Sequence, residues 1–79
     1  MQTVEFRTRT NPATPWELCQ VSFTRRFKTE VDNKLRLVKR IDMVAQNLAD
    51  SEGQDVRWNF EGDTAGHVIP PASPLPKGV

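Results

Sequence analysis

The chain has very few of the residues on which catalytic and metal sites are built. Cys19 is its only cysteine and His67 its only histidine. No internal disulfide can form, which predicts a reducing, cytoplasmic location. A nucleophilic cysteine needs a neighbouring base, whereas His67 falls in a proline-rich segment far along the chain. Asp63 and His67, four residues apart, lack the further ligands of a metal site. We therefore expect a protein that is not an enzyme and carries no metal or cofactor.

Long apolar runs and glycine-rich loops are also missing. No stretch approaches the ~18–20 apolar residues needed to span a bilayer. The first five residues have neither the basic start nor the apolar core of a signal peptide. The four glycines are scattered and lack a phosphate-binding spacing after a strand. These absences predict a cytoplasmic domain that does not bind membranes.

Charge is divided unevenly along the chain, although the net charge is only +1. Residues 6–40 carry nine bases and three acids, whereas residues 41–63 carry six acids and Arg57 as the only base. Such a division favours a molecule with a basic and an acidic side, and hence a surface that binds a charged partner. Because the boundary near Arg40 falls inside a predicted helix, we interpret the division as polarity within one domain.

Alternation of apolar and polar residues predicts three strands. Residues 4–7 and 19–26 alternate in this way, and residues 11–15, which include two prolines, predict the loop between them. Residues 56–60 predict a third strand with large apolar residues on one face. The strand residues expected to face the core are Val4, Phe6, Cys19, Val21, Phe23, Trp58 and Phe60.

Residues 28–50 predict one long amphipathic helix. Thr29 and Asp32 match a capping box at its start, and Gly53 lies where a left-handed cap would end it. Apolar residues recur at spacings of three and four between these signals. The helix residues expected to face the sheet are Val31, Leu35, Val38, Ile41, Ala45 and Leu48.

This helix is longer than one small sheet requires. At about 30 Å it would extend beyond strands of about 17–20 Å. Leu37 and Val44 also widen its apolar stripe. We therefore expect the helix to bind either a second copy of the chain, as a homodimer, or a partner protein.

Together these elements predict a small α+β domain of ββαβ order, with a three-stranded sheet packed on one helix. We expect the third strand to pair beside the first, which keeps the sheet antiparallel. The domain is predicted to span residues 1–62, and residues 63–79 to form a flexible, proline-rich tail. Pro71 and Pro74 give this tail a PxxP spacing, which binds aromatic grooves in other proteins, although four nearby prolines produce that spacing easily.

Two groups of basic residues and one tryptophan are candidate partner-binding residues. One group lies on the outer side of the predicted helix, and the other on the sheet face opposite the helix. Trp16 in the first loop would serve as an interface anchor if exposed; the alternative is that it closes one end of the core. The helix group consists of Arg36, Lys39 and Arg40, and the sheet group of Arg7, Arg9, Arg26 and Arg57.

These features predict a small protein-binding module, an inhibitor or regulator that docks through segregated charge. A phage or other viral origin would fit so compact a regulator. The alternative is a nucleic-acid-binding protein whose sheet arginines contact phosphates. Proteins that bind single strands place aromatic residues on the open sheet face, whereas the aromatic residues here are expected on the core side. We therefore favour a protein partner.

Overall fold

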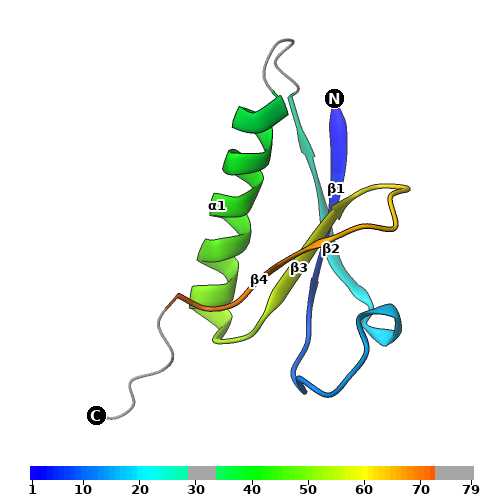
Figure 1. The fold of residues 1–79 in the computed structure, drawn as a ribbon, viewed down its shortest axis with the longest axis vertical. Coiled ribbons are helices and arrows are strands. Elements are labelled where there is room, and N and C mark those ends of the chain that lie inside the picture. The colour runs from blue at the N-terminus through cyan, green and yellow to red at the C-terminus, as the bar shows by residue number, and fades with distance from the viewer. Residues whose placement is uncertain (29–33, 73–79) are drawn as a thin grey trace.

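A computed structural model describes residues 1–28 and 34–72 of the chain. Its four strands form one antiparallel sheet in the order β2–β1–β3–β4, and α1 lies along one face of that sheet (Figure 1). The predicted α+β class is therefore confirmed. The elements in chain order are β1 (Gln2–Thr8), a short 3₁₀ turn η1 (Trp16–Leu18), β2 (Val21–Phe27), α1 (Lys34–Glu52), β3 (Val56–Phe60) and β4 (His67–Ile69).

The sheet has four strands, so the prediction of three was wrong. β3 pairs beside β1 in antiparallel fashion, as expected. The fourth strand, β4, comes from the segment predicted to be a tail and pairs with β3. Pro70 directly follows Ile69 and has no N–H to donate to a ladder, so β4 is short and lies at the sheet edge. Residues 73–79 of the predicted tail lie outside the described residues.

The core lies between α1 and the central strands of the sheet. Trp58 is its largest fully buried side chain. The Trp58 indole stacks on His67 of β4 with ring centroids 4.3 Å apart, and its Nε1–H donates to Asp42 Oδ1 of α1 at 2.8 Å. One side chain thus connects β3, β4 and α1. The buried apolar residues are Val4, Phe6, Phe27, Leu37, Ile41, Ala45, Ala49, Val56 and Trp58.

The buried face of α1 agrees with the predicted one in part: Ile41 and Ala45 are buried, Val38 and Leu48 pack on the core, and Val31 lies outside the described residues. Leu37, Ile41, Ala45 and Ala49 recur every four residues and form a single buried line. Leu35, predicted to face the sheet, is 65% exposed. The short alanine side chains let the second half of α1 approach the sheet, which explains why this line faces inward. Leu37 was expected to remain available to a second copy, yet it belongs to the core.

β2 is poorly covered by α1. Six of its seven residues are exposed and only Phe27 is buried. Val21 and Phe23, both predicted to be core residues, are 38% and 37% exposed. The reason is that α1 packs closest to β3 and β4, so β2, two strands further across the sheet, extends beyond the helix. Cys19, also predicted for the core, precedes β2 and is partly exposed, with Sγ 3.6 Å from the Pro15 carbonyl oxygen.

α1 ends at the predicted glycine. Gly53 has a φ of 67°, a left-handed conformation that glycine adopts without a Cβ clash. The Gly53 and Gln54 N–H groups both donate to the Ala49 carbonyl, at 2.8 and 3.3 Å. The predicted capping box at Thr29 and Asp32 lies outside the described residues. No helix within the described parts of the chain is long and apolar enough to cross a membrane.

The last turn of α1 is charged in the unfavourable sense. It contains Asp50 and Glu52 and no basic residue, although the C-terminal end of a helix carries partial negative charge. Asp50 has a local role, because its Oδ1 accepts hydrogen bonds from the Gln46 amide at 3.1 Å and the Ala72 N–H at 2.8 Å. Glu52 is exposed. The helix is therefore electrostatically destabilised at this end.

Replacing Glu52 with lysine is expected to raise the free energy of unfolding by about 0.3–1 kcal/mol, because it exchanges repulsion from the helix end for attraction. Urea denaturation followed by circular dichroism measures this gain. The gain should shrink in about 1 M salt, where screening is strong. Glu52→Gln is the matched control and should give an intermediate value. A lysine variant no more stable than the glutamine variant would contradict the prediction.

Candidate partner-binding surface

The predicted site residues lie in two separate places. One group surrounds a hollow on the sheet face away from α1, near the end of β1. The other surrounds the opposite end of the molecule, where β2 ends and α1 begins. The first group contains Arg7, Arg9, Trp16 and Arg57, and the second contains Arg26, Arg36, Lys39 and Arg40.

The hollow has a volume of about 280 Å³ and lies between the sheet, η1 and the turn between β3 and β4. Arg7 and Arg57 are direct partners across β1 and β3, so both point to this face, opposite the buried Phe6 and Trp58. Three acids and two bases line the hollow, which gives it no dominant sign of charge. Its lining residues are Glu5, Arg7, Trp16, Glu17, Arg57, Asn59, Asp63 and Thr64.

Arg7 is held by a network at the floor of the hollow. Its Nη1 donates to Asn59 Oδ1 at 2.8 Å, and its Nη2 lies 3.6 Å from Glu5 Oε1. Asn59, only 3% exposed, donates from Nδ2 to the same Glu5 oxygen at 3.0 Å. The Arg7 charge is thus compensated within the sheet and is poorly placed to bind a phosphate.

Arg9 and Arg57 are also held by their surroundings. Arg9 donates to Asp55 Oδ2 and to the Thr14 carbonyl oxygen, each at 3.2 Å, and its guanidinium lies 4.2 Å from the centre of the Trp16 ring. Arg57 donates to the Thr64 carbonyl at 3.0 Å. Its guanidinium lies so close to the backbone of the β3–β4 turn that a side chain at residue 66 would collide with it. Through these hydrogen bonds, Arg9 and Arg57 connect the loops to the sheet.

Trp16 is neither a fully exposed interface anchor nor a residue that closes one end of the core. It is half-buried, and it packs against Arg9 outside the core. The Arg9 contact occupies one face of its ring. Trp16 therefore lines the hollow as part of the loop anchored by Arg9.

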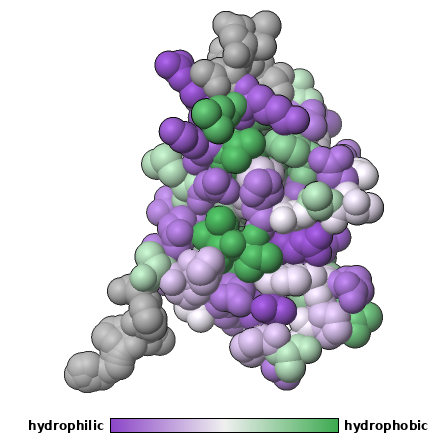
Figure 2. Space-filling view, viewed as in Figure 1, coloured by the Kyte–Doolittle hydropathy of each residue, from purple (hydrophilic) through white to green (hydrophobic). Residues whose placement is uncertain are grey.

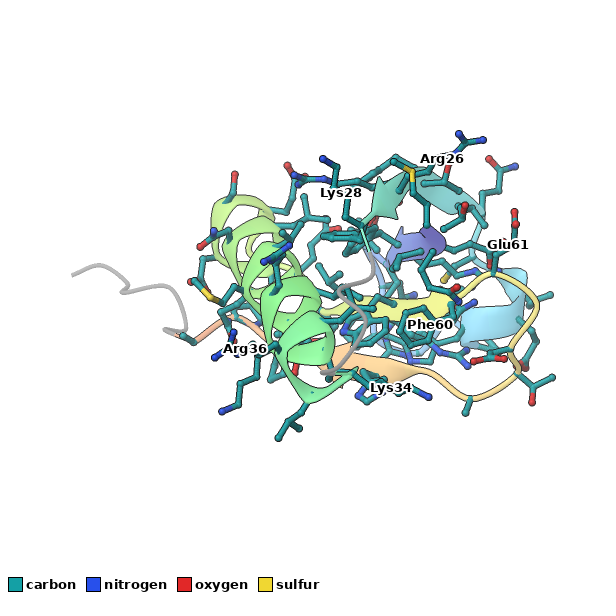
Figure 3. All side chains as sticks on the ribbon, turned by 90° about the horizontal axis from the view of Figure 1, so that it is seen from above. Arg26, Lys28, Lys34, Arg36, Phe60 and Glu61 are labelled. Atoms are coloured by element: carbon teal, nitrogen blue, oxygen red, sulfur yellow. The ribbon has the colours of Figure 1, made fainter. Side chains whose placement is uncertain are left out.

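Basic side chains surround the opposite end of the molecule, which we call the basic end. Figure 3 shows Arg26 and Lys28 along one side of this end, Lys34 on the other, and Arg36 on the outer side of α1. These four residues, with Arg25, Lys39 and Arg40, are exposed. Glu61, which Figure 3 labels at the same end, is an exposed acid, and two further acids, Glu30 and Asp32, occur in the sequence between Lys28 and Lys34. The seven residues of the basic end are Arg25, Arg26, Lys28, Lys34, Arg36, Lys39 and Arg40.

The basic end continues along the side of the molecule that carries β2. Arg40 lies on the β2 side of α1, because Asp42, two residues and about 200° further round the helix, contacts Trp58 on the other side. On β2, Arg25 is on the same face as Phe23 and Phe27, and its guanidinium lies 5.1 Å from the Phe27 ring centre. Exposed bases and an exposed phenylalanine thus occur together at the uncovered strand.

The face that shows α1 and β4 has a different character. In Figure 2 its apolar side chains gather in two separate patches with polar side chains between them. Val44, expected to contribute to a second-copy interface, is half-buried and packs on the core. Leu35 and Met43, the exposed large apolar residues of α1, are eight positions apart and about 80° apart around the helix. Within residues 34–72 this face has no continuous apolar stripe of the kind on which the homodimer prediction depended.

Sequence reasoning did not find Phe23, Arg25 and Lys28 as part of a surface. Alternation of apolar and polar residues looks the same in a covered strand and in an uncovered edge strand, so Phe23 was assigned to the core. The only available signal was composition, since β2 has two arginines and no acidic residue. Comparisons of the chain with models of protein families, with curated proteins and with solved structures gave no match.

Proposed function

We propose that this protein is a small, non-enzymatic binding module that docks its basic end on an acidic surface of a partner protein, as an inhibitor or regulator. The observation that supports this most directly is the coincidence of seven exposed bases with an uncovered edge strand. The core is formed mainly by α1, β1 and β3, and Phe27 is the buried residue of β2.

A protein partner is favoured over nucleic acid by the residues beside the charges. Phe23 is exposed on the same face of β2 as Arg25, and an apolar side chain of this kind buries area against another protein. The sheet arginines proposed for phosphate contacts are held by Asn59, Asp55 and Thr64 instead. In the described parts of the chain the strands present no aromatic side chain to the open sheet face, because Phe6 and Trp58 point to the core, and Trp16 beside that face is in contact with Arg9.

Charge at the two ends of α1 would orient the docked complex. Lys34, Arg36, Lys39 and Arg40 occupy its first half, whereas Asp50 and Glu52 occupy its last turn. A dipolar molecule approaches an acidic surface with its basic end first, which raises the association rate and disfavours the reverse orientation.

The proposal is tested by neutralising the basic end. The double variant Lys39→Gln/Arg40→Gln should bind the partner about tenfold more weakly, because each lost charge contact contributes ~0.7 kcal/mol. Asn47→Glu/Ser51→Glu is the matched control: it changes the net charge by the same amount on exposed positions further along α1. The measurement is affinity capture from a nuclease-treated lysate of the source organism, followed by titration of the purified captured protein.

We expect the wild type and the control pair to retain one acidic protein that the neutralised pair loses. Circular dichroism verifies that all three proteins are folded. Two results would overturn the proposal: capture that is unaffected by Lys39→Gln/Arg40→Gln, or capture that disappears on nuclease treatment and is replaced by binding to an oligonucleotide. The second result would support the nucleic-acid alternative.

A further inference from the structure

We infer that the outer edge of β2 is a docking strand, which pairs through its main chain with an extended, acidic segment of the partner protein. This inference rests on the proposed function and adds the mode of binding. An edge strand offers a row of unpaired N–H and C=O groups to another chain, and strand addition uses these groups for affinity and the alternate side chains for specificity. β2 is the edge strand next to the basic end.

The hydrogen-bond pattern shows which main-chain groups of β2 point outward. The Glu61 N–H donates to the Thr3 carbonyl at 2.9 Å, so Thr3 directs its main-chain groups toward the β3 side of β1. These directions alternate along an antiparallel strand. The even-numbered residues of β1 therefore direct theirs toward β2, where their register partners are the odd-numbered residues from 23 to 27. Thr24 and Arg26, which lie between those partners, direct their N–H and C=O groups to the open edge.

β2 has only two of the features that protect edge strands from pairing, a register irregularity and two charged side chains. It is seven residues long and contains no proline. Its irregularity is confined to the pairing between Phe6 and Arg7, near the start of β2, and the register is regular from Phe23 to Phe27. α1 does not cover it, since six of its seven residues are exposed. Five consecutive residues thus present a regular, accessible edge.

The charges of β2 specify an acidic segment as the occupant. Arg25 lies on the helix side of the strand with Phe23, and Arg26 lies on the opposite face, since its register partner is Thr3. An added strand with two adjacent acidic residues would place a carboxylate beside each arginine, and an apolar residue two positions from the one beside Arg25 would lie beside Phe23. Lys28 extends the basic character past the end of the strand.

A second copy of the chain is a poorer occupant. Antiparallel pairing of two β2 strands about Thr24 would place the two Arg25 side chains at diagonal positions, roughly 7–8 Å apart. Like charges at this separation repel, because it is no longer than the Debye length of about 8 Å at physiological salt. β2 has no acidic residue to compensate them. The carboxylates of an acidic partner segment would instead attract the arginines of β2.

The test uses a displayed library of random peptides about twelve residues long, selected against the wild-type protein. We expect the selected peptides to contain two adjacent acidic residues, with a β-branched or aromatic residue two positions from one of them. Thr24→Pro should then weaken their binding about tenfold, since it removes one outward N–H and adds a ring at the edge. Thr24→Val is the matched control: it keeps the N–H and should bind as the wild type does. Proline is tolerated on the open side of an edge strand, and circular dichroism verifies the fold.

A second measurement needs no protein variant. Methylating the main-chain nitrogens of alternate residues in a selected peptide blocks one of its two edges. One alternation should abolish binding and the other should leave it unchanged, because only one edge faces β2. Equal effects of the two alternations, or no enriched peptide, would overturn the strand-pairing inference.

The outcomes separate this inference from the proposed function. If Lys39→Gln/Arg40→Gln weakens peptide binding while Thr24→Pro and Thr24→Val bind equally, the basic end docks without strand pairing and the inference is wrong. If neither change matters, both proposals are wrong. A wild-type dimer in light scattering that Thr24→Pro dissociates would assign the edge to a second copy and would also overturn the inference.

Discussion

Replacing Trp58 with alanine is expected to remove a large part of the free energy of unfolding. The side chain is fully buried, and Trp→Ala changes at such sites cost about 3–5 kcal/mol. A chain of this size has a total stability of roughly 4–12 kcal/mol. The loss is severe here because Trp58 contacts three elements, through His67 of β4, Asp42 of α1 and the Phe60 ring 5.3 Å away.

Far-ultraviolet circular dichroism during urea denaturation measures the effect, because fluorescence would also report on Trp16. Trp58→Phe is the matched control. It retains an aromatic ring opposite His67 but removes the hydrogen bond to Asp42, and we expect a cost of about 1–3 kcal/mol. An alanine variant that unfolds at nearly the wild-type urea concentration would mean that Trp58 does not hold these elements together.

Phe6→Ala is expected to lower the free energy of unfolding by about 3–5 kcal/mol, whereas Phe23→Ala should cost about 1–2 kcal/mol. The two rings stack on each other with centroids 4.7 Å apart and planes 12° apart. They differ in burial, since Phe6 is fully buried and Phe23 is 37% exposed. Removing Phe6 leaves a cavity in the core, and removing Phe23 takes away mainly one stacking contact and partly buried area.

This pair of variants also separates stability from binding. Urea midpoints give the stability difference, and peptides selected on the wild type give the affinity of each folded variant. We expect Phe23→Ala to bind at least several-fold more weakly despite its modest effect on stability, because the exposed ring face is available to a partner. Equal destabilisation by the two changes would show that Phe23 is a core residue. Unchanged peptide binding by Phe23→Ala would remove it from the docking surface.

Local signals in the sequence predicted most of the elements. Gly53 ended α1 as expected, because a left-handed cap depends only on the residue at that position. The strand containing Trp58 and Phe60 was correctly placed beside β1, because that position, unlike one beside β2, keeps the sheet antiparallel. Arg7, Arg26 and Arg57 also lie on the predicted sheet face, because alternation fixes the side of a strand.

The fourth strand and the position of α1 depend on contacts between residues far apart in the sequence, which local signals do not show. His67–Ile69 forms β4 only because β3 has a free edge and Trp58 offers a ring on which His67 stacks. α1 then lies toward β3 and β4, which uncovers Phe23 and rotates the buried line to Leu37. The candidate docking surface at β2 is exposed because α1 is displaced toward β3 and β4. The arginines of the open face were correctly located, but the sequence could not show that Asn59 and Asp55 hold two of them.

The position of β1 determines when this fold can be completed during synthesis. β1 precedes the other described strands along the chain and lies in the interior of the sheet, between β2 and a β3 that ends only at Phe60. Its pairing with β3 joins residues more than 45 positions apart, such as Arg7 and Arg57. Such distant contacts close slowly. On the ribosome the β1–β2 hairpin must therefore wait, with the apolar face of Val4 and Phe6 uncovered, until nearly the whole domain has emerged.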